Sequence, residues 1–196
     1  MTFRFDKPAG CMTGAFLIIC LTFSCTSYTP KPRGYFRIEL PEAMYRTLSA
    51  DSLPFGFRIS TLATVEYPPK DVQEKWINIS YPALEAKIYC TYLPATPSSM
   101  EALGRESRAL VSRQTKGAGR MTQQAYEHPE KKVYALLYES DGASASPIQF
   151  TVTDSMANFF RGALLYNRPP DADSLAPVTR YLKDDIMELI QSFYWK

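Results

Sequence analysis

The sequence predicts an α+β protein in which a mainly antiparallel sheet is packed by two principal helices. Three observations predict this class. Several short segments alternate apolar and polar residues with the period of half-buried strands. Two longer segments, residues 98–114 and a stretch near the C-terminus, repeat their apolar residues with a helical period. Links of hairpin length join several of the strand segments, which favours antiparallel pairing.

The first strand segments follow residue 35. Apolar side chains alternate over residues 36–40, 55–59, 77–81 and 86–92, and prolines fall between these runs or at their edges. A proline there does not interrupt a ladder of backbone hydrogen bonds, because its missing N–H is not needed.

The period changes to that of a helix at Ser98. Ser98 and Glu101 have the spacing of a capping box, which predicts a helix from Ser98 to about Gln114 that ends before Gly117 and Gly119. One face of this helix is expected to carry Met100, Leu103, Ser107, Leu110 and Val111, and the opposite face Arg105, Arg108, Arg113 and Lys116. The basic face is interpreted as a solvated helix back, because Glu101 and Glu106 dilute it, or as a contact for anionic lipid, cell-wall polymer or an acidic partner.

Strand character returns in the second half of the chain. Residues 133–139 and 148–153 form a predicted hairpin around Asp141 and Gly142, and residues 159–166 form a further strand. A polar loop is expected at 171–176, with Asp173 or Ser174 capping a last helix. The apolar stripe of that helix comprises Val178, Leu182, Ile186, Leu189, Ile190 and Phe193.

The N-terminus is predicted to be a signal peptide over residues 1–24. Basic residues precede a short apolar run that ends at Ser24 and Cys25, and this run is too short to span a bilayer. Cys25 is therefore expected to become the acylated first residue of the mature chain. Ordinary secretion, with cleavage after Ser24 or Ser27, is the alternative. Residues 25–34 form a Pro-rich tether, and residues 35–196 a single domain.

Cysteine and charge exclude some functions. Two further cysteines lie inside the signal, so Cys90 remains as a buried, unpaired thiol. Loss of residues 1–24 removes two basic residues and one acidic residue, which leaves a formal net charge of +1 from the +2 of the full chain. That balance gives no reason to expect nucleic-acid binding.

No residue pattern indicates catalysis or a metal site. His128, the only histidine, is interpreted as an exposed turn residue, and one His with one Cys cannot supply a zinc site. Asp171 and Asp173 lack the Gly and Glu of a calcium loop. Residues 142–146 resemble half of a nucleophile elbow but follow a hairpin turn. Candidates for the paired carboxylates of glycoside chemistry are Glu139 and Asp154. No glycine-rich phosphate loop is present.

Several segments in order resemble one known family. They are residues 28–37 with Leu40 and Pro41, then 76–82, 146–155, 160–164, 173–177 and 192–196. Together they resemble the GldD family, the gliding-motility-associated lipoproteins of the Bacteroidota. The resemblance implies a cell-envelope lipoprotein acylated at Cys25, tied to type 9 secretion, with no known enzymatic activity and no cofactor. The strand-rich pattern with a final helix is also similar to the Mog1/PsbP-like fold, an analogy that carries no function.

These observations lead to a functional hypothesis. The protein is expected to be a non-enzymatic accessory factor, lipid-anchored in the cell membrane or outer membrane and facing the periplasm, that binds other envelope lipoproteins or motility and secretion components. Its candidate surface comprises residues 76–82 and 146–161. Within it, Trp76, Asp154 and Arg161 are candidates for interaction or for a structural role, Asp154 as a turn cap and Arg161 as a buried ion pair. The alternatives are an envelope enzyme acting on glycan through paired carboxylates, and a small-ligand or lipid-binding module with a large apolar cavity.

Overall fold

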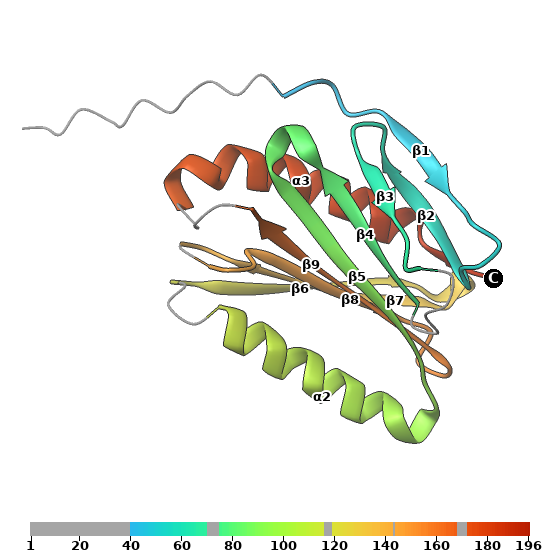
Figure 1. The fold of residues 1–196 in the computed structure, drawn as a ribbon. Helices are drawn as coiled ribbons and strands as arrows, with labels where there is room; N and C mark the ends of the chain where they lie inside the picture. Colours follow the sequence, from blue (N-terminus) through green and yellow to red (C-terminus); the bar gives the residue numbers. More distant parts are fainter. Residues whose placement is uncertain (1–39, 70–74, 116–118, 143, 168–171) are drawn as a thin grey trace, which may run out of the picture. The chain divides into compact units, whose positions relative to one another are not determined.

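The fold is known from a computed structural model that describes residues 40–69, 75–115, 119–142, 144–167 and 172–196. All of them belong to one compact unit. Figure 1 shows antiparallel strands with two long helices, α2 (Pro97–Gln114) and α3 (Ala172–Ser192). The predicted α+β class, with two principal helices and a mainly antiparallel sheet, is confirmed.

Most of the strands form one large sheet. In the described residues it has seven strands, each antiparallel to its neighbours, in the order β3-β4-β5-β9-β8-β7-β6. Their bounds, in that order, are Thr64–Glu66, Lys75–Tyr81, Ala86–Pro94, Asn158–Tyr166, Ile148–Thr153, Val133–Ser140 and Met121–His128. Because β5 pairs with β9, strands far apart in the sequence meet at the centre of the sheet.

A second, smaller sheet contains β1 (Tyr45–Leu48), β2 (Phe55–Ser60) and β10 (Tyr194–Trp195). β2 pairs with both neighbours, so the end of the chain returns to strands near its start. The predicted strand at 36–40 lies outside the described residues except for Leu40, which is not in a strand.

Two hairpins of the large sheet turn through the same local structure. β4–β5 and β6–β7 are each joined by one turn of 3-10 helix, η1 (Pro82–Leu84) and η2 (Pro129–Lys131), with the proline at its start. Glu85 and Lys132 close these turns in the left-handed conformation, with φ of 49° and 52°. Proline suits the first position of such a turn because its missing N–H would have no partner there.

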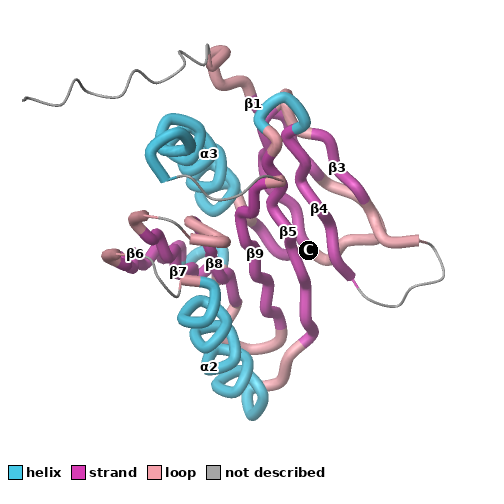
Figure 2. The backbone as a smooth tube through the Cα atoms, turned by 60° about the vertical axis from the view of Figure 1, so that its left-hand side comes forward, coloured by secondary structure: helices cyan, strands magenta, loops and turns pink. Residues whose placement is uncertain are grey.

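The two helices lie on opposite faces of the strands β7, β8 and β9 (Figure 2). α3 and the small sheet cover the face that holds the main core. Phe193, directly after α3, stacks on Phe55 and Phe57 of β2, and its ring centroid lies 5.3 Å from that of Phe160 in β9. All four rings are almost fully buried. The predicted apolar stripe of α3 is buried as well.

The helix starts differ from those expected. α2 begins at Pro97, because Thr96 is the N-cap: its hydroxyl accepts from the backbone N–H of Ser99 (3.2 Å), and Ser99 Oγ accepts from the N–H of Thr96 (2.9 Å). The expected box between Ser98 and Glu101 is therefore wrong by two residues. α3 begins at Ala172, so Asp173 and Ser174 lie inside its first turn and not at the cap, and residues 172–176 are not a loop. Asp171 and Gly117 lie outside the described residues.

Candidate functional site

The second face of the large sheet is only partly covered. Along β4, the alternating residues Ile77 and Ile79 are fully buried on the core side, whereas Trp76 and Asn78 point the other way and are half-buried. α2 crosses this second face over β6 to β9, and within the described part of the chain no helix lies over β4 or β5 (Figure 2). We call the uncovered area over β4 and β5, together with the adjoining Arg161 of β9 beside α2, the open sheet face; its residues are Trp76, Asn78, Lys87, Tyr89, Thr91 and Arg161.

Strand register places two of the residues singled out in the sequence on this face. Trp76 of β4 pairs with Thr91 of β5, and Thr91 pairs with Arg161 of β9. Since neighbouring strands lie about 4.8 Å apart, Trp76 and Arg161 have backbones about 10 Å apart in one cross-strand row. An aromatic side chain and an Arg are thereby presented together, as is typical of interaction surfaces.

Arg161 is not the buried ion pair that the sequence suggested. Its guanidinium lies 4.0 Å from a carboxylate oxygen of Glu106 on α2, and the two side chains are 32% and 63% exposed. An ion pair so long and so exposed contributes little to stability. The guanidinium of Arg161 thus keeps capacity for a further anionic partner.

A second row crosses the same face. Asn78, Tyr89, Ala163, Gln149 and Tyr138 are successive cross-strand neighbours from β4 to β7. Tyr89 is 43% exposed, the highest value for a large apolar or aromatic side chain within this row.

Hydrogen bonds join three polar side chains at one end of the open sheet face, those of Glu66, Asn78 and Lys87. Lys87 donates to both carboxylate oxygens of Glu66 (2.9 and 3.0 Å), and Asn78 donates to the same carboxylate at 3.3 Å. These hydrogen bonds, that of Lys87 first, lower the pKa of Glu66, and the bond to Glu66 raises the pKa of Lys87. Lys87 Nζ also lies 5.7 Å from the centre of the Tyr89 ring. The Tyr89 ring therefore lies beside the ammonium group of Lys87, which Glu66 holds in place.

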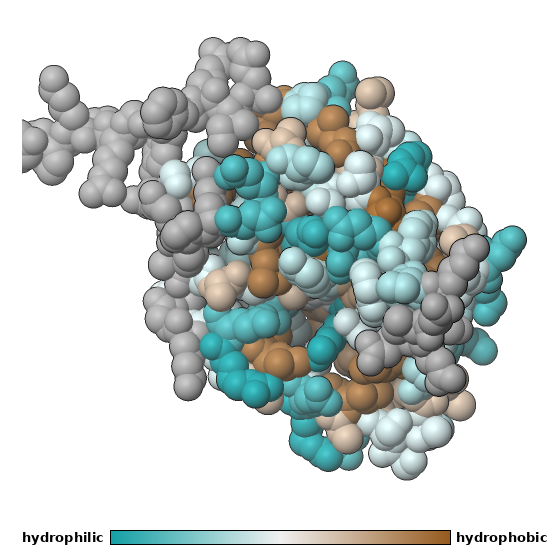
Figure 3. All heavy atoms as spheres, viewed as in Figure 1, coloured by the Kyte–Doolittle hydropathy of each residue, from teal (hydrophilic) through white to brown (hydrophobic). Residues whose placement is uncertain are grey.

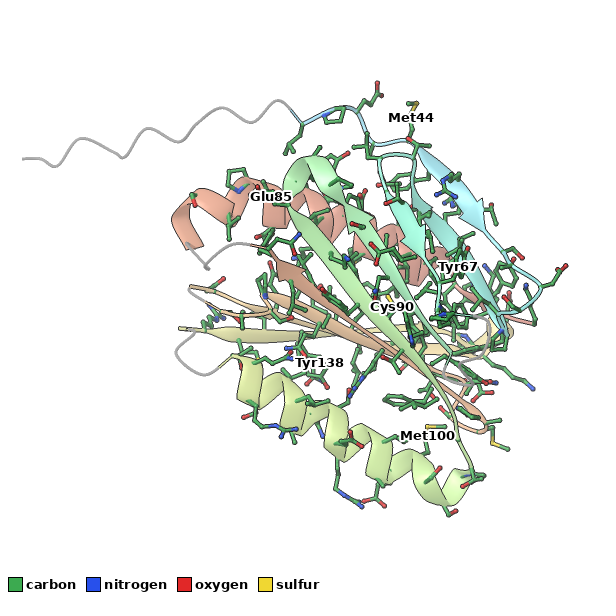
Figure 4. The ribbon with its side chains drawn as sticks, viewed as in Figure 1. Met44, Tyr67, Glu85, Cys90, Met100 and Tyr138 are labelled. Atoms are coloured by element: carbon green, nitrogen blue, oxygen red, sulfur yellow. The ribbon has the colours of Figure 1, made fainter. Side chains whose placement is uncertain are left out.

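A cavity of about 270 Å³ lies where the open sheet face meets α2. Tyr138 extends from β7 toward α2 at this place (Figure 4), and burial raises the pKa of its hydroxyl. Figure 3 shows brown apolar and teal polar residues intermixed over the lower part of the molecule, where α2 lies. The cavity is also lined by Ser107, Leu110, Val111, Gln114, Gln149, Arg161 and Leu165.

Two buried side-chain amide atoms in the cavity wall lack hydrogen-bond partners. Gln149 Nε2 on β8 and Gln114 Oε1 on α2 are almost inaccessible to water, and neither has a partner among the described residues. Gln149 as a whole is only 7% exposed. A buried donor or acceptor without a partner costs about 1–3 kcal/mol, so these two groups call for an explanation.

Asp154 has a structural environment away from this face. One of its carboxylate oxygens accepts from the backbone N–H groups of Met156, Ala157 and Asn158 (2.8–2.9 Å), and the other accepts from Asn158 Nδ2 (2.7 Å). Burial would raise the pKa of Asp154, but these four bonds outweigh it and the pKa is lowered. Ser155 takes a left-handed φ of 65° in the same turn. The geometry is that of the turn cap that the sequence suggested.

The candidate catalytic carboxylates do not converge. Glu139 lies opposite Ile148 at the start of β8 and pairs with Lys183 of α3 (2.6 Å), whereas Asp154 follows the end of that strand. Six residues of strand separate backbones by about 20 Å, well beyond the carboxylate spacing of glycosidases. The small serines are also structural: Ser144 Oγ donates to the carbonyl of Ser146 (3.0 Å) and accepts from its N–H (3.2 Å).

Cys90 lies in the core, whereas His128 lies at a turn. Cys90 is a free thiol buried in β5, and burial raises its pKa. His128 ends β6 and precedes Pro129 at the start of η2; it is half-buried there, so the turn is as expected but the side chain is less exposed.

One buried polar cluster, around Asp185, was not predicted from the sequence. Asp185 on α3 is 3% exposed and accepts from Tyr45 Oη of β1 (3.1 Å). Burial raises the pKa of Asp185 by more than the nearby hydroxyls of Tyr81, Tyr45 and Ser60 lower it. A signal was present, because Asp185 falls within the apolar stripe between Leu182 and Ile186. A carboxylate inside such a stripe indicates a buried polar contact.

The described residues hold neither a metal-binding cluster nor a helix able to cross a membrane. Within the described ranges, no group of three or more His, Cys, Asp or Glu side chains is placed to hold a metal ion. No helix among the residues that the structure describes is long and apolar enough to cross a membrane.

The fold and the open sheet face define an α+β domain in which an antiparallel sheet carries one helix on each face. Residues 25–195 match the family described as gliding motility lipoprotein GldD, and the chain belongs to this family. The resemblance noted in the sequence is confirmed. No match was found among curated proteins.

The fold is also similar to a solved structure of low sequence identity. This is the solution structure of cyanobacterial PsbP (CyanoP) from Synechocystis sp. PCC 6803, with a TM-score of 0.46 and 9% identity, covering 85% of this chain and 100% of that one. The likeness carries no functional conclusion for this chain.

Proposed function

We propose that this protein is a non-enzymatic accessory factor of gliding motility or type 9 secretion, and that it acts by binding other envelope proteins through the open sheet face. The observation that carries the proposal is the cross-strand row of Trp76, Thr91 and Arg161, which no helix covers at β4 and β5 in the described residues. Membership of a motility lipoprotein family supports the biological setting.

The anchor in this proposal is Cys25. The family match begins at this residue, directly after the signal peptide predicted over residues 1–24. Acyl groups on Cys25, followed by the Pro-rich tether 25–34, hold the domain 35–196 at a membrane and in the periplasm. Each buried CH₂ of such chains contributes about 0.8 kcal/mol of membrane affinity.

The chemistry of the open sheet face fits a protein partner. Trp, Tyr and Arg are enriched among residues that dominate binding energy at interfaces. Tyr89 and Arg161 are both partly exposed, and the strands beneath them are paired on both sides. A rigid sheet loses little conformational entropy on association, which favours binding.

The enzyme alternative is not supported by the geometry, because Glu139 and Asp154 lie at opposite ends of β8. The alternative of a binding module retains one specific observation, the cavity beside α2.

The test is capture from envelopes of the native host. A tagged chain and its Cys25→Ala variant are expressed in cells that lack the endogenous copy, crosslinked and solubilised. The proposal expects the intact chain to restore gliding or secretion and to capture a defined set of motility, secretion or envelope lipoproteins, with the capture weakened in the variant. Full restoration without any protein adduct would contradict it.

A further inference from the structure

We infer that the cavity between α2 and the large sheet binds the C-terminal end of a polypeptide, with Arg161 receiving the terminal carboxylate and the buried amides of Gln149 and Gln114 receiving the last peptide group. The inference rests on the proposed function, because it names the part of the partner that reaches the open sheet face.

The cavity continues from the open sheet face. The row Asn78, Tyr89, Ala163 leads directly to Gln149 and Tyr138, both of which line the cavity. A chain that lies over β4 and β5 is therefore close enough to place its end in the cavity.

The two amide atoms without partners have complementary chemistry. Gln149 Nε2 is a donor and Gln114 Oε1 is an acceptor. A peptide group offers one acceptor and one donor, so a single ligand amide can satisfy both. The terminal torsion of a Gln side chain is soft, so both groups can reorient toward a ligand.

Arg161 supplies the positive charge for the terminal carboxylate of the ligand. It lines the same cavity, and its existing contact with Glu106 is 4.0 Å long. A guanidinium can bind a carboxylate through two parallel hydrogen bonds, which Glu106 does not achieve at that distance. A carboxylate that enters the cavity is therefore expected to displace this weak pair.

The remaining walls fit an apolar side chain of modest size. Leu110 and Val111 of α2 and Leu165 of β9 line the cavity. Its volume of about 270 Å³ is at the lower limit for small-molecule sites, which suits one or two residues and not a long acyl chain.

The test measures peptide binding by calorimetry with the full chain in detergent micelles. The probes are the acetylated tetrapeptide Ala-Ala-Ala-Leu as the free acid, its C-terminal amide, and N-acetyl-leucine. We expect the acid to bind at least tenfold more tightly than the amide, and tenfold more tightly than N-acetyl-leucine. Equal binding of acid and amide would overturn the carboxylate assignment, and equal binding of tetrapeptide and N-acetyl-leucine would assign the cavity to a free acylated amino acid.

Two variants with matched controls locate the contact. Arg161→Gln is expected to weaken binding of the acid at least tenfold, since the charge-assisted hydrogen bonds between the guanidinium and the carboxylate are lost. Arg58→Gln, which removes an Arg of the small sheet paired with Glu188, is expected to leave binding unchanged. Loss of binding in both variants, or in neither, would overturn the role of Arg161.

The Gln149→Leu variant separates a ligand group from a structural one. Because it removes an unpartnered buried amide, it is expected to raise the melting temperature of the free protein while abolishing the shift that the tetrapeptide produces. Gln191→Leu, on the exposed side of α3, is the control. A lower melting temperature for Gln149→Leu would mean that the amide is paired within the protein, and would overturn the inference. If no probe binds while a photoreactive residue placed at Tyr89 still crosslinks to an envelope protein, this inference fails and the proposed function stands.

Discussion

Trp76 and Arg161 lie in one cross-strand row of the large sheet, separated only by Thr91. The two residues are 85 positions apart in the chain, and they meet because β5 pairs with β9. Their shared row turns two separate sequence segments, 76–82 and part of 146–161, into one surface. The loop that contains Asp154 does not belong to that surface, since its carboxylate is used within its own turn.

Replacement of Arg161 by Ala should separate binding from folding. Its ion pair with Glu106 is long and exposed, so the free energy of unfolding is expected to change by less than about 1 kcal/mol. Capture of the envelope partner should fall at least tenfold. Urea unfolding and quantitative capture measure the two effects, and a large loss of stability would instead make Arg161 structural.

Asp154→Ala should destabilise the protein by about 1–2 kcal/mol at neutral pH, because three backbone N–H groups lose their acceptor. The folded pKa of Asp154 is lowered, so its contribution is present above the unfolded pKa of about 3.9 and is lost as the pH falls through the folded value. Urea unfolding at pH 7 and near pH 3 should show the difference from wild type shrinking. Asp141→Ala, in an exposed turn, is the matched control. A difference that stays constant with pH would count against this role.

Asp185→Asn should stabilise the protein at neutral pH, the opposite of the effect expected for Asp154→Ala. The folded pKa of Asp185 is raised by burial, so the stability linked to its proton is fully present below the unfolded pKa and is lost as the pH rises through the folded value. Asn keeps an acceptor for Tyr45 and carries no charge, so the variant should be more stable than wild type by about 1 kcal/mol at neutral pH, with the gain disappearing in acid. Thermal unfolding across pH tests this, with exposed Asp184→Asn as control. Destabilisation at pH 7 would show that the ionised carboxylate is needed.

Two glycines should respond differently to replacement by Ala. A Cβ at Gly162 in β9 would overlap the ring of Phe150, so Gly162→Ala should cost about 1–3 kcal/mol. At Gly104 in α2 the nearest neighbour of a Cβ is Arg108 Nη1 at 3.5 Å, an ordinary contact, and the helix should gain up to about 1 kcal/mol. Denaturant melts of both variants test the packing, and equal effects would contradict it.

The sequence predicts the buried elements of this fold well. β2, β4, β5, β7, β8 and β9 bury alternate apolar side chains, and α3 buries a full stripe, so their periods are visible. The start of α2 is harder to place, because Thr96 with Ser99 and Ser98 with Glu101 have the same spacing. Pro97, which suits the first position of a helix, favours the pair of Thr96 and Ser99 that the structure shows.

The elements without such a signal are edge or very short strands. β6 is a sheet edge with mostly exposed polar residues, so its alternation carries no apolar pattern. β1, β3 and β10 have four, three and two residues, too few to show a period.

The candidate site could be predicted only in part. Trp76 and Arg161 can be named from the sequence, but their shared row depends on the pairing of β5 with β9. Gln149 and Gln114 carry no sequence signal, because only the packing of α2 on the sheet buries their amide groups.

The central claim is that the open sheet face binds an envelope protein, and site-specific photocrosslinking tests it most directly. A photoreactive benzoylphenylalanine is placed at Tyr89 on that face or at Leu62 in the small-sheet region, two sites of nearly equal exposure (43% and 42%). In living cells of the native host, position 89 should give a discrete adduct with one envelope protein, weakened by Arg161→Gln, and position 62 should not. The same adducts from both positions, or none from position 89 in cells that glide or secrete normally, would contradict the account.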